Sequence, residues 1–184
     1  MRTVLDVETT TWSKDWKEGE PLEDTNPSPY IPANKLVCIG LLEETPETGE
    51  GKAHILFSDS FHKAQEILTS TTLLIGHNLK FDLSWIKESG LQYDGEIWDT
   101  KLCEYIESRG RSWDTDLNSC LARHFPKRAD LQKHDILETY FKQGVNTDKI
   151  PREELAKYLE QDLRVTWELY LDQEKPYSEE LTPF

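Results

Sequence analysis

The sequence predicts an α/β fold built around a single sheet, and three observations support this. Short aliphatic and β-branched runs over residues 2–7, 35–42 and 54–57 have the length and composition of strands. After them, one further apolar run, residues 73–75, lies between segments with the periodicity of helices. Strands followed by mixed strand and helix are typical of an α/β domain. The 184 residues contain no internal repeat and no linker, so we expect one domain over residues 1–184.

The connections between the first three strands differ in character. The second and third strands are joined by EETPETGEGK, whose glycine, proline and glutamate favour an exposed hairpin connection. Residues 11–34, after the first strand, contain four prolines and have no period. A loop of this length in a compact domain is usually functional or disordered.

Helices are predicted from the middle of the chain onward. We expect a helix over residues 61–68, a buried strand over 73–75, and a second helix that starts at residue 78 and has Gly90 as its C-cap. The remainder is mostly helical, with segments expected over residues 100–108, 117–124, 136–142 and a long stretch after 151.

The charge balance bears on function. The chain has 35 acidic and 21 basic residues, a net charge of -14, which argues against the commonest electrostatic route to nucleic acid. The charge is uneven, however, because residues 101–150 carry +1 while residues 1–100 carry -10. A basic stretch within residues 109–133 is either a path for a nucleic-acid strand or a solvated helical face. Its basic residues are Arg109, Arg111, Arg123, Lys127, Arg128 and Lys133.

Other features limit the class of protein. Six Trp, seven Tyr and six Phe supply enough apolar surface for a core. Cys38, Cys103 and Cys120 have no CxxC spacing, so we expect buried thiols rather than disulfides or a zinc site. No apolar run approaches the roughly 18 residues of a membrane span, and the N-terminus lacks the features of a signal peptide. We therefore expect a cytoplasmic protein without membrane contact.

Three acids stand in places that suit chemistry, each with an ordinary alternative. Asp6 and Glu8 lie in the first strand, where a period of two places both on one face. Such a pair is also common at a solvated strand end. Asp82 lies in the first turn of the second helix, where an acid also interacts favourably with the helix dipole.

A fourth acid lies on the apolar face of the last helix. Leu155, Leu159 and Leu169 mark that face, and Asp162 occupies one of its positions. A buried carboxylate is costly unless it is paired or bound to a metal. Tyr158, four residues earlier, lies on the same face. Two explanations remain for Asp162: an Arg or Lys partner, or a cation shared with other acids.

Together these residues resemble the DEDD exonucleases of the ribonuclease H-like fold, in the subgroup with tyrosine in its third motif. They look most like the proofreading 3′–5′ exonuclease domain of family A DNA polymerases. Asp6 and Glu8 match the Asp-x-Glu of the first motif, NLKFD over residues 78–82 the second, and Tyr158 with Asp162 the Tyr-x-x-x-Asp of the third. WDT over 98–100 and DLNSCLA over 116–122 extend the resemblance, which runs to about residue 172.

The resemblance implies a fold and an activity. The fold is a mixed sheet, with three antiparallel strands followed by parallel strands, flanked by helices. The activity is hydrolysis at the 3′ end of single-stranded or frayed DNA by two divalent ions, Mg²⁺ or Mn²⁺, with release of nucleotide 5′-monophosphates. The resemblance implies that Asp6 bridges both ions, Glu8 and Asp162 complete the water-activating site, Asp82 holds the second ion mainly through water, and Tyr158 orients the attacking water.

Contacts to the strand are also implied by the resemblance. Asn78 and the backbone around Glu8 and Thr9 are expected to contact the terminal nucleotide. The uneven charge, rather than the resemblance, makes Arg109 and Arg111 of the basic stretch candidates for contacts to the strand. Among the aromatics of the 11–34 loop, Trp12 and Trp16 either stack on bases or pack the loop onto the domain. His77 is expected to have a packing role or to lie at the edge of the substrate site.

Two other functions remain open. The first keeps the chemistry and changes the substrate to RNA, as in ribonuclease D-like relatives that share the tyrosine motif. The second is a binding module, or an accessory subunit of a separate DNA polymerase, with little hydrolysis of its own.

Overall fold

The computed structural model describes the chain except for residues 18, 46–50, 110, 112, 132–135 and 181–184. At its centre is a five-stranded sheet with the order β5-β4-β1-β6-β7. Strands β1, β4 and β5 are antiparallel, whereas β6 runs parallel to β1 and β7 parallel to β6, which confirms the expected mixed sheet. The five strands are β1 (Arg2–Thr9), β4 (Leu36–Glu44), β5 (Gly51–Phe57), β6 (Leu73–Gly76) and β7 (Glu96–Asp99).

The helices agree with the predicted segments, with differences mainly at their ends. Gly90 lies just beyond the end of the second helix at φ +83°, a conformation that suits glycine and ends the helix there. None of the helices in the described part of the chain combines the length and the apolar character of a membrane span. The helices are α1 (His62–Ser70), α2 (Leu79–Glu88), α3 (Thr100–Glu107), α4 (Leu117–His124), α5 (Ile136–Lys142) and α6 (Arg152–Glu180), with short 3₁₀ turns η1 (Ala129–Leu131) and η2 (Thr147–Lys149).

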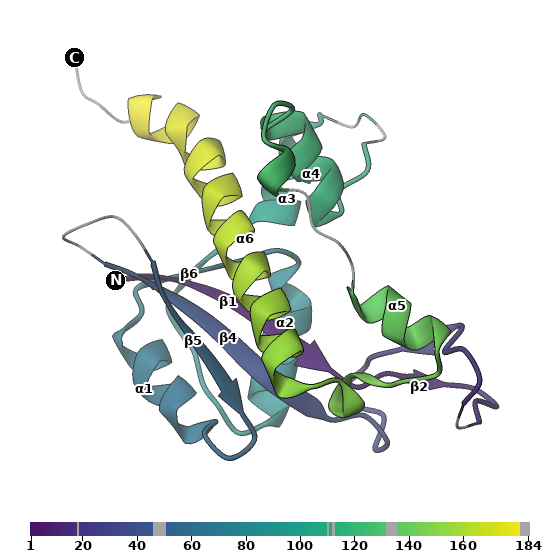
Figure 1. Ribbon diagram of the computed structural model, residues 1–184. Helices are drawn as coiled ribbons and strands as arrows, with labels where there is room; N and C mark the ends of the chain where they lie inside the picture. Colours follow the sequence, from purple (N-terminus) through teal and green to yellow (C-terminus); the bar gives the residue numbers. More distant parts are fainter. Residues whose placement is uncertain (18, 46–50, 110, 112, 132–135, 181–184) are drawn as a thin grey trace.

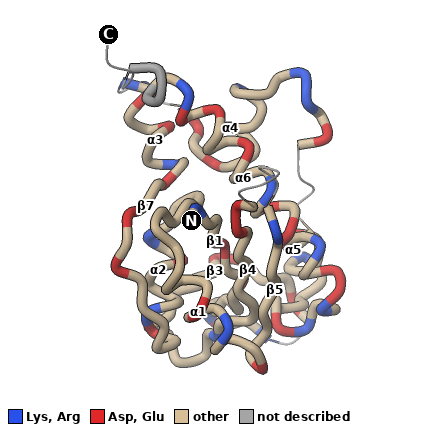
Figure 2. Tube along the Cα trace, turned by 90° about the vertical axis from the view of Figure 1, so that its left-hand side faces the viewer, with Lys and Arg blue, Asp and Glu red and all other residues tan. Residues whose placement is uncertain are grey.

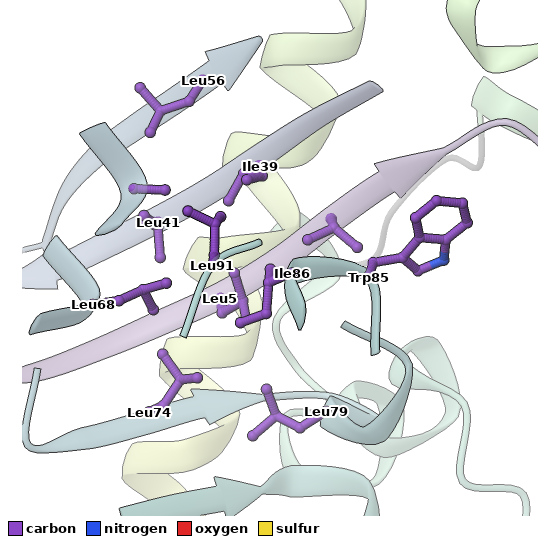
Figure 3. Packing of buried hydrophobic residues seen from close by; sticks show 12 residues of the cluster. Leu5, Ile39, Leu41, Leu56, Leu68, Leu74, Leu79, Trp85, Ile86 and Leu91 are labelled. Atoms are coloured by element: carbon purple, nitrogen blue, oxygen red, sulfur yellow. The ribbon is translucent and has the colours of Figure 1, made fainter. Parts of the chain in front are cut away.

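Helices cover both faces of the sheet (Figure 1). On one face, Val4 of β1 packs in one cluster with Leu163 and Trp167 of α6. On the other face, Leu5 of β1 packs with residues of α1 and α2, among them Ile86 (Figure 3). Because side chains alternate along a strand, the residues of β1 that follow Val4 at a spacing of two also face α6. This alternation decides where the acids of β1 lie.

Helices α3 and α4 pack against the C-terminal half of α6. Cys120 and Leu121 of α4 form a cluster with Val165 and Leu169 of α6. Within the described residues, Cys38, Cys103 and Cys120 form no disulfide; Cys38 and Cys120 are buried, and Cys103 is partly exposed. Burial raises the pKa of the Cys120 thiol to about 12, so this thiol is protonated at neutral pH.

The long loop over residues 11–34 has more structure than its sequence predicts. It contains a small hairpin of β2 (Trp12–Ser13) and β3 (Thr25–Asn26). The side chain of Asn146 makes two hydrogen bonds to the backbone of Thr11, just before this hairpin. Its Oδ1 accepts from the Thr11 N–H at 3.1 Å, and its Nδ2 donates to the Thr11 carbonyl at 2.8 Å. The Leu22 N–H donates to the Phe141 carbonyl at 2.9 Å, which joins the loop to α5 beside it (Figure 1). The local pattern gave no sign of these partners because they lie far away in the chain.

Candidate active site

The site begins on β1, at the end of the sheet where the strand leaves the core. Asp6 and Glu8 follow Val4 at a spacing of two and therefore lie on the α6 face, and the pairing register shifts between Glu8 and Thr9. Asp6 pairs with Gly40 of β4. A Cβ added to Gly40 would lie 2.8 Å from Leu159 Cγ of α6. The glycine thus allows α6 to approach the sheet directly opposite Asp6.

This close approach brings a third carboxylate to the strand. Asp162 lies on the buried stripe of α6, 3% exposed, and Glu8 is 8% exposed. Asp6, Glu8 and Asp162 each offer one carboxylate oxygen, and these oxygens all lie within 4.8 Å of one another. The geometry favours the second explanation for Asp162, a cation shared with other acids. We call these three residues the carboxylate cluster.

Asp82 flanks the carboxylate cluster without belonging to it. It lies in the first turn of α2 and is 2% exposed. Its Oδ1 accepts a hydrogen bond from the Val7 N–H at 3.1 Å, and the same N–H lies 3.0 Å from Oδ1 of Asp6. Burial raises the pKa of Asp82 well above its ordinary value, and the negative charge of Asp6 adds to this effect. Two acids are therefore held side by side at a cost that a cation would offset.

The start of α2 is fixed by Asp99, whose role the sequence did not predict. Asp99 is the N-cap of α3, and its Oδ1 accepts from Lys101 N at 3.0 Å. The same carboxylate accepts from Asn78 N at 3.0 Å and from Leu79 N at 2.9 Å. One side chain therefore caps the helix that carries Asp82 and also the next helix. An Asp just before a predicted helix is the sequence signal for an N-cap, and this signal could identify Asp99 as the cap of α3. It could not identify the hydrogen bonds that Asp99 accepts at the start of α2.

His77 joins the end of β6 to the segment before α4. Its Nδ1 lies 2.9 Å from Thr100 Oγ1, and its Nε2 lies 2.9 Å from the Thr115 carbonyl oxygen. Because a carbonyl only accepts, Nε2 carries a proton. Burial lowers the pKa of His77. These contacts agree with the packing role expected for His77.

The predicted substrate contacts are dispersed around the carboxylate cluster. Asn78 is exposed at φ 69°, and its side chain does not cap α2. Trp12 is 41% exposed, whereas Thr9 is buried at 7%. Arg109 and Arg111 are exposed in the connection between α3 and α4.

The basic stretch is less available to a strand than its sequence suggests. Arg123 pairs with the buried Glu104 at 2.9 Å, and Arg128 with Asp130 at 2.8 Å. Lys133 lies outside the described residues. Figure 2 shows acidic and basic positions interleaved along the trace. The four arginines of this stretch are all exposed, Arg123 and Arg128 within their ion pairs. The Arg111 guanidinium carbon lies 5.7 Å from the Trp113 ring centroid.

A comparison with known families decides the classification. The profile of the 3′–5′ exonuclease family of DNA polymerase A type matches residues 25–175. The chain belongs to this 3′–5′ exonuclease family. The matched region includes Asp82, Tyr158 and Asp162, and it begins after Asp6 and Glu8. The predicted family is thereby confirmed.

A curated relative carries the same domain within a longer protein. The chain is 29% identical over 195 residues to a DNA polymerase of Bacillus phage SP01. The match covers 91% of this chain and 19% of that polymerase, so the chain spans about a fifth of its relative's length.

Solved structures share the fold. Brucella melitensis NrnC with bound Mg²⁺ has a TM-score of 0.60 at 12% identity, with 97% of this chain and 74% of that chain covered. NrnC bound to pGG has a TM-score of 0.58 at 13% identity, with the same shares covered. A structure described as the apo form of the nuclease has a TM-score of 0.61 at 10% identity, again over 97% of this chain and 74% of that one. The predicted ribonuclease H-like fold is therefore confirmed.

Proposed function

We propose that residues 1–184 form one metal-dependent exonuclease domain that removes nucleotides from the 3′ end of single-stranded or frayed DNA. The observation that carries this proposal is the carboxylate cluster, in which oxygens of Asp6, Glu8 and Asp162 lie within 4.8 Å of one another. A site of this kind, at the end of the strand and beneath α6, suits phosphodiester hydrolysis in a member of this exonuclease family.

The cluster fits Mg²⁺ or Mn²⁺. Carboxylate oxygens are the ligands these ions prefer. Ligands on opposite sides of Mg²⁺ lie about 4.2 Å apart, since each bond is about 2.1 Å long, so oxygens within 4.8 Å of one another need little movement to share an ion. Asp6, Glu8 and Asp162 would hold the ions, with Asp82 beside Asp6. When bound, two divalent ions supply positive charge against the charge that develops at phosphorus and favour deprotonation of water.

The remaining side chains would position the reactants. Tyr158 lies one turn before Asp162 on α6 and is 8% exposed, and its hydroxyl would orient the attacking water. Water adds to the last phosphodiester phosphorus, and the bond to the 3′ oxygen of the preceding nucleotide breaks. The products are a nucleoside 5′-monophosphate and a strand with a new 3′ hydroxyl. Asn78 and the backbone near Thr9 would contact the terminal nucleotide.

The preference for DNA is supported by the relative in phage SP01, which is a DNA polymerase. The likeness to NrnC bound to pGG supports an alternative, in which the substrate is a short oligonucleotide or RNA. The third possibility is an accessory module of a DNA polymerase with little turnover of its own, which is supported by the similarity to the phage SP01 DNA polymerase.

A matched pair of substrates tests these options. DNA and RNA strands of one sequence, each with a 5′ label, are incubated with the purified chain and Mg²⁺ or Mn²⁺, and with EDTA as the control. Stepwise shortening of the DNA, release of 5′-monophosphates and no reaction in EDTA would support the proposal. Faster shortening of the RNA would favour the exoribonuclease, and no shortening of either strand would favour the accessory module.

A further inference from the structure

A groove lies next to the start of α2, beside the carboxylate-bearing elements but separate from the carboxylate cluster. It has a volume of about 340 Å³, within the range of ligand sites, and it lies between the 11–34 loop and the outer side of α2. Asn78, the residue before α2 that is expected to contact the terminal nucleotide, is one of its lining residues. The residues that line it are Asn26, Pro27, Ser28, Pro29, Tyr30, Asn78, Lys80, Phe81 and Ser84.

The loop side of the groove is held in place by hydrogen bonds. The indole N–H of Trp85, a buried residue of α2, donates to the Pro27 carbonyl at 3.0 Å. The side-chain amide of Asn34 donates to the carbonyls of Asn26 at 2.7 Å and Ser28 at 2.9 Å. The Tyr30 N–H donates to Ser28 Oγ at 3.3 Å. The groove is therefore largely pre-formed, and a ligand would bind without ordering this segment.

The lining has the chemistry that binds an unpaired nucleotide. Tyr30 is 72% exposed and offers a free ring, and Phe81 offers a second, partly exposed one. Lys80 is exposed and is the charged residue of the lining; none of the nine lining residues, all in the described part of the chain, is acidic. By contrast, a second cavity on the same loop, around Trp16, is lined by Asp15, Glu20, Glu23 and Asp24. In a chain of charge -14, a groove without acids is suited to a phosphate-bearing ligand.

We propose that this groove binds an unpaired base, together with its neighbouring phosphate, of the strand whose 3′ end reaches the carboxylate cluster. Tyr30 stacks on the base, and Lys80 neutralises the phosphate. The proposal rests on the proposed nuclease function for the identity of the ligand, and it adds a second element of strand recognition that comes from the 11–34 loop. It assigns to Tyr30 the stacking role that the sequence suggested for the tryptophans of this loop.

Fluorescence of 2-aminopurine tests the stacking directly and needs no turnover. A short single strand carries 2-aminopurine at the terminal, the penultimate or the third position from its 3′ end, and it is titrated with protein in EDTA at low ionic strength. At one of these positions the wild type should quench the probe, Tyr30→Phe should quench it equally, and Tyr30→Ala should bind roughly 5- to 150-fold more weakly without that quenching. Tyr105→Ala, which removes a ring that is 65% exposed on α3, is the matched control and should behave as the wild type.

The phosphate contact has its own readout. Lys80→Gln should reduce the slope of log affinity against log salt concentration by about 0.7, the value for one phosphate contact on a single strand. Equal quenching by Tyr30→Ala and wild type at every position, or an unchanged salt slope in Lys80→Gln, would overturn the proposal. If the chain degrades no strand but the Tyr30-dependent quenching is observed, the nuclease proposal fails and the groove remains a single-strand site. If the chain degrades the strand but the quenching does not depend on Tyr30, the nuclease proposal stands and the proposed role of the groove fails.

Discussion

Asp6 and Asp82 accept hydrogen bonds from one and the same donor, because the Val7 N–H lies 3.0 Å from Oδ1 of Asp6 and 3.1 Å from Oδ1 of Asp82. The shared donor holds two carboxylates from distant parts of the chain next to each other. Burial and the charge of Asp6 then raise the pKa of Asp82, so the folded chain alone disfavours the ionised pair. The arrangement costs stability in the absence of a cation and favours the binding of one.

Neutralising Asp6 should therefore stabilise the metal-free protein. The raised pKa of Asp82 means that the folded state loses stability as the pH rises above the ordinary carboxyl pKa. Asp6→Asn removes the charge that contributes to this shift and preserves an acceptor for the Val7 N–H. In EDTA at pH 8 we expect Tm to rise by roughly 2–4 °C, which corresponds to about 1 kcal/mol in a chain of this length. The measurement is thermal unfolding followed by circular dichroism.

Addition of Mn²⁺ supplies the control for this prediction. An ion that binds only the folded state raises Tm by mass action, so Mn²⁺ should raise Tm of the wild type more than that of Asp6→Asn. A lower Tm of Asp6→Asn in EDTA would contradict the stated role of this charge. Equal responses of both proteins to Mn²⁺ would argue against Asp6 as a ligand.

Gly40 should be as important for the site as the acids it supports. In Gly40→Ala the new Cβ would lie 2.8 Å from Leu159 Cγ and 2.9 Å from Leu163 Cδ1, so α6 must move away from the sheet. We expect a loss of roughly 1–3 kcal/mol in the free energy of unfolding, together with weaker Mn²⁺ binding because α6 carries Asp162. Urea unfolding and a Mn²⁺ titration measure the two effects.

A second substitution separates packing from other causes. Leu159→Ala makes room for the added methyl group, so the double variant should be more stable than the sum of the single effects predicts. Strict additivity would contradict a direct contact between positions 40 and 159.

Asp99 should contribute more to stability than an ordinary helix cap. Asp99→Ala removes bonds to the starts of both α2 and α3, whereas Asp116→Ala removes the cap of α4 alone, where Asp116 accepts from Ser119 N at 2.9 Å. One N-cap is worth about 1 kcal/mol, so we expect a loss of roughly 2 kcal/mol for Asp99→Ala and about half of that for Asp116→Ala. Denaturant unfolding of both variants is the test, and equal losses would mean that the bonds to α2 contribute little.

His124 should make stability depend on pH. Its Nδ1 lies 2.8 Å from Asp172 Oδ2 and its Nε2 2.8 Å from Glu104 Oε2, so both ring nitrogens donate and the ring is charged. Burial alone would lower the pKa of His124, but the hydrogen bonds to the two acids outweigh it and raise the pKa. A raised histidine pKa contributes stability that is fully present below about pH 6.5 and is lost as the pH rises through the folded value.

The comparison with His124→Asn makes this measurable. The difference in Tm between the wild type and His124→Asn should be largest near pH 6 and should shrink toward pH 9. The neighbouring ion pairs of Arg123 with Glu104 and of Lys175 with Asp172 remain in both proteins. A difference that stays constant or grows with pH would contradict a charged His124.

The parts of the fold that depend on local pattern were predictable. The aliphatic run of β1 and the apolar stripe of α6, with Leu155 and Leu159, are visible in sequence because burial repeats at the period of the element. The edge strand β7 gave no such signal, since Ile97 within it is 54% exposed, and only the resemblance around WDT pointed to it.

The site was predictable to a similar degree. The acids and Tyr158 could be named from their motifs, but the contacts that hold them depend on elements far apart in the chain. Gly40 acts through α6, and Asp99 acts through the start of α2. The 11–34 loop looked unstructured because its partners, Asn146 and Trp85, lie elsewhere in the sequence. No local period reports such partners.

The most direct test of the central claim is the shortening of a 5′-labelled single-stranded DNA in Mg²⁺ or Mn²⁺ by the wild type and by Asp162→Ala. The variant must first be shown to be folded by circular dichroism. The proposed function predicts stepwise shortening from the 3′ end by the wild type and none by Asp162→Ala. Shortening by Asp162→Ala at the rate of the wild type would contradict it.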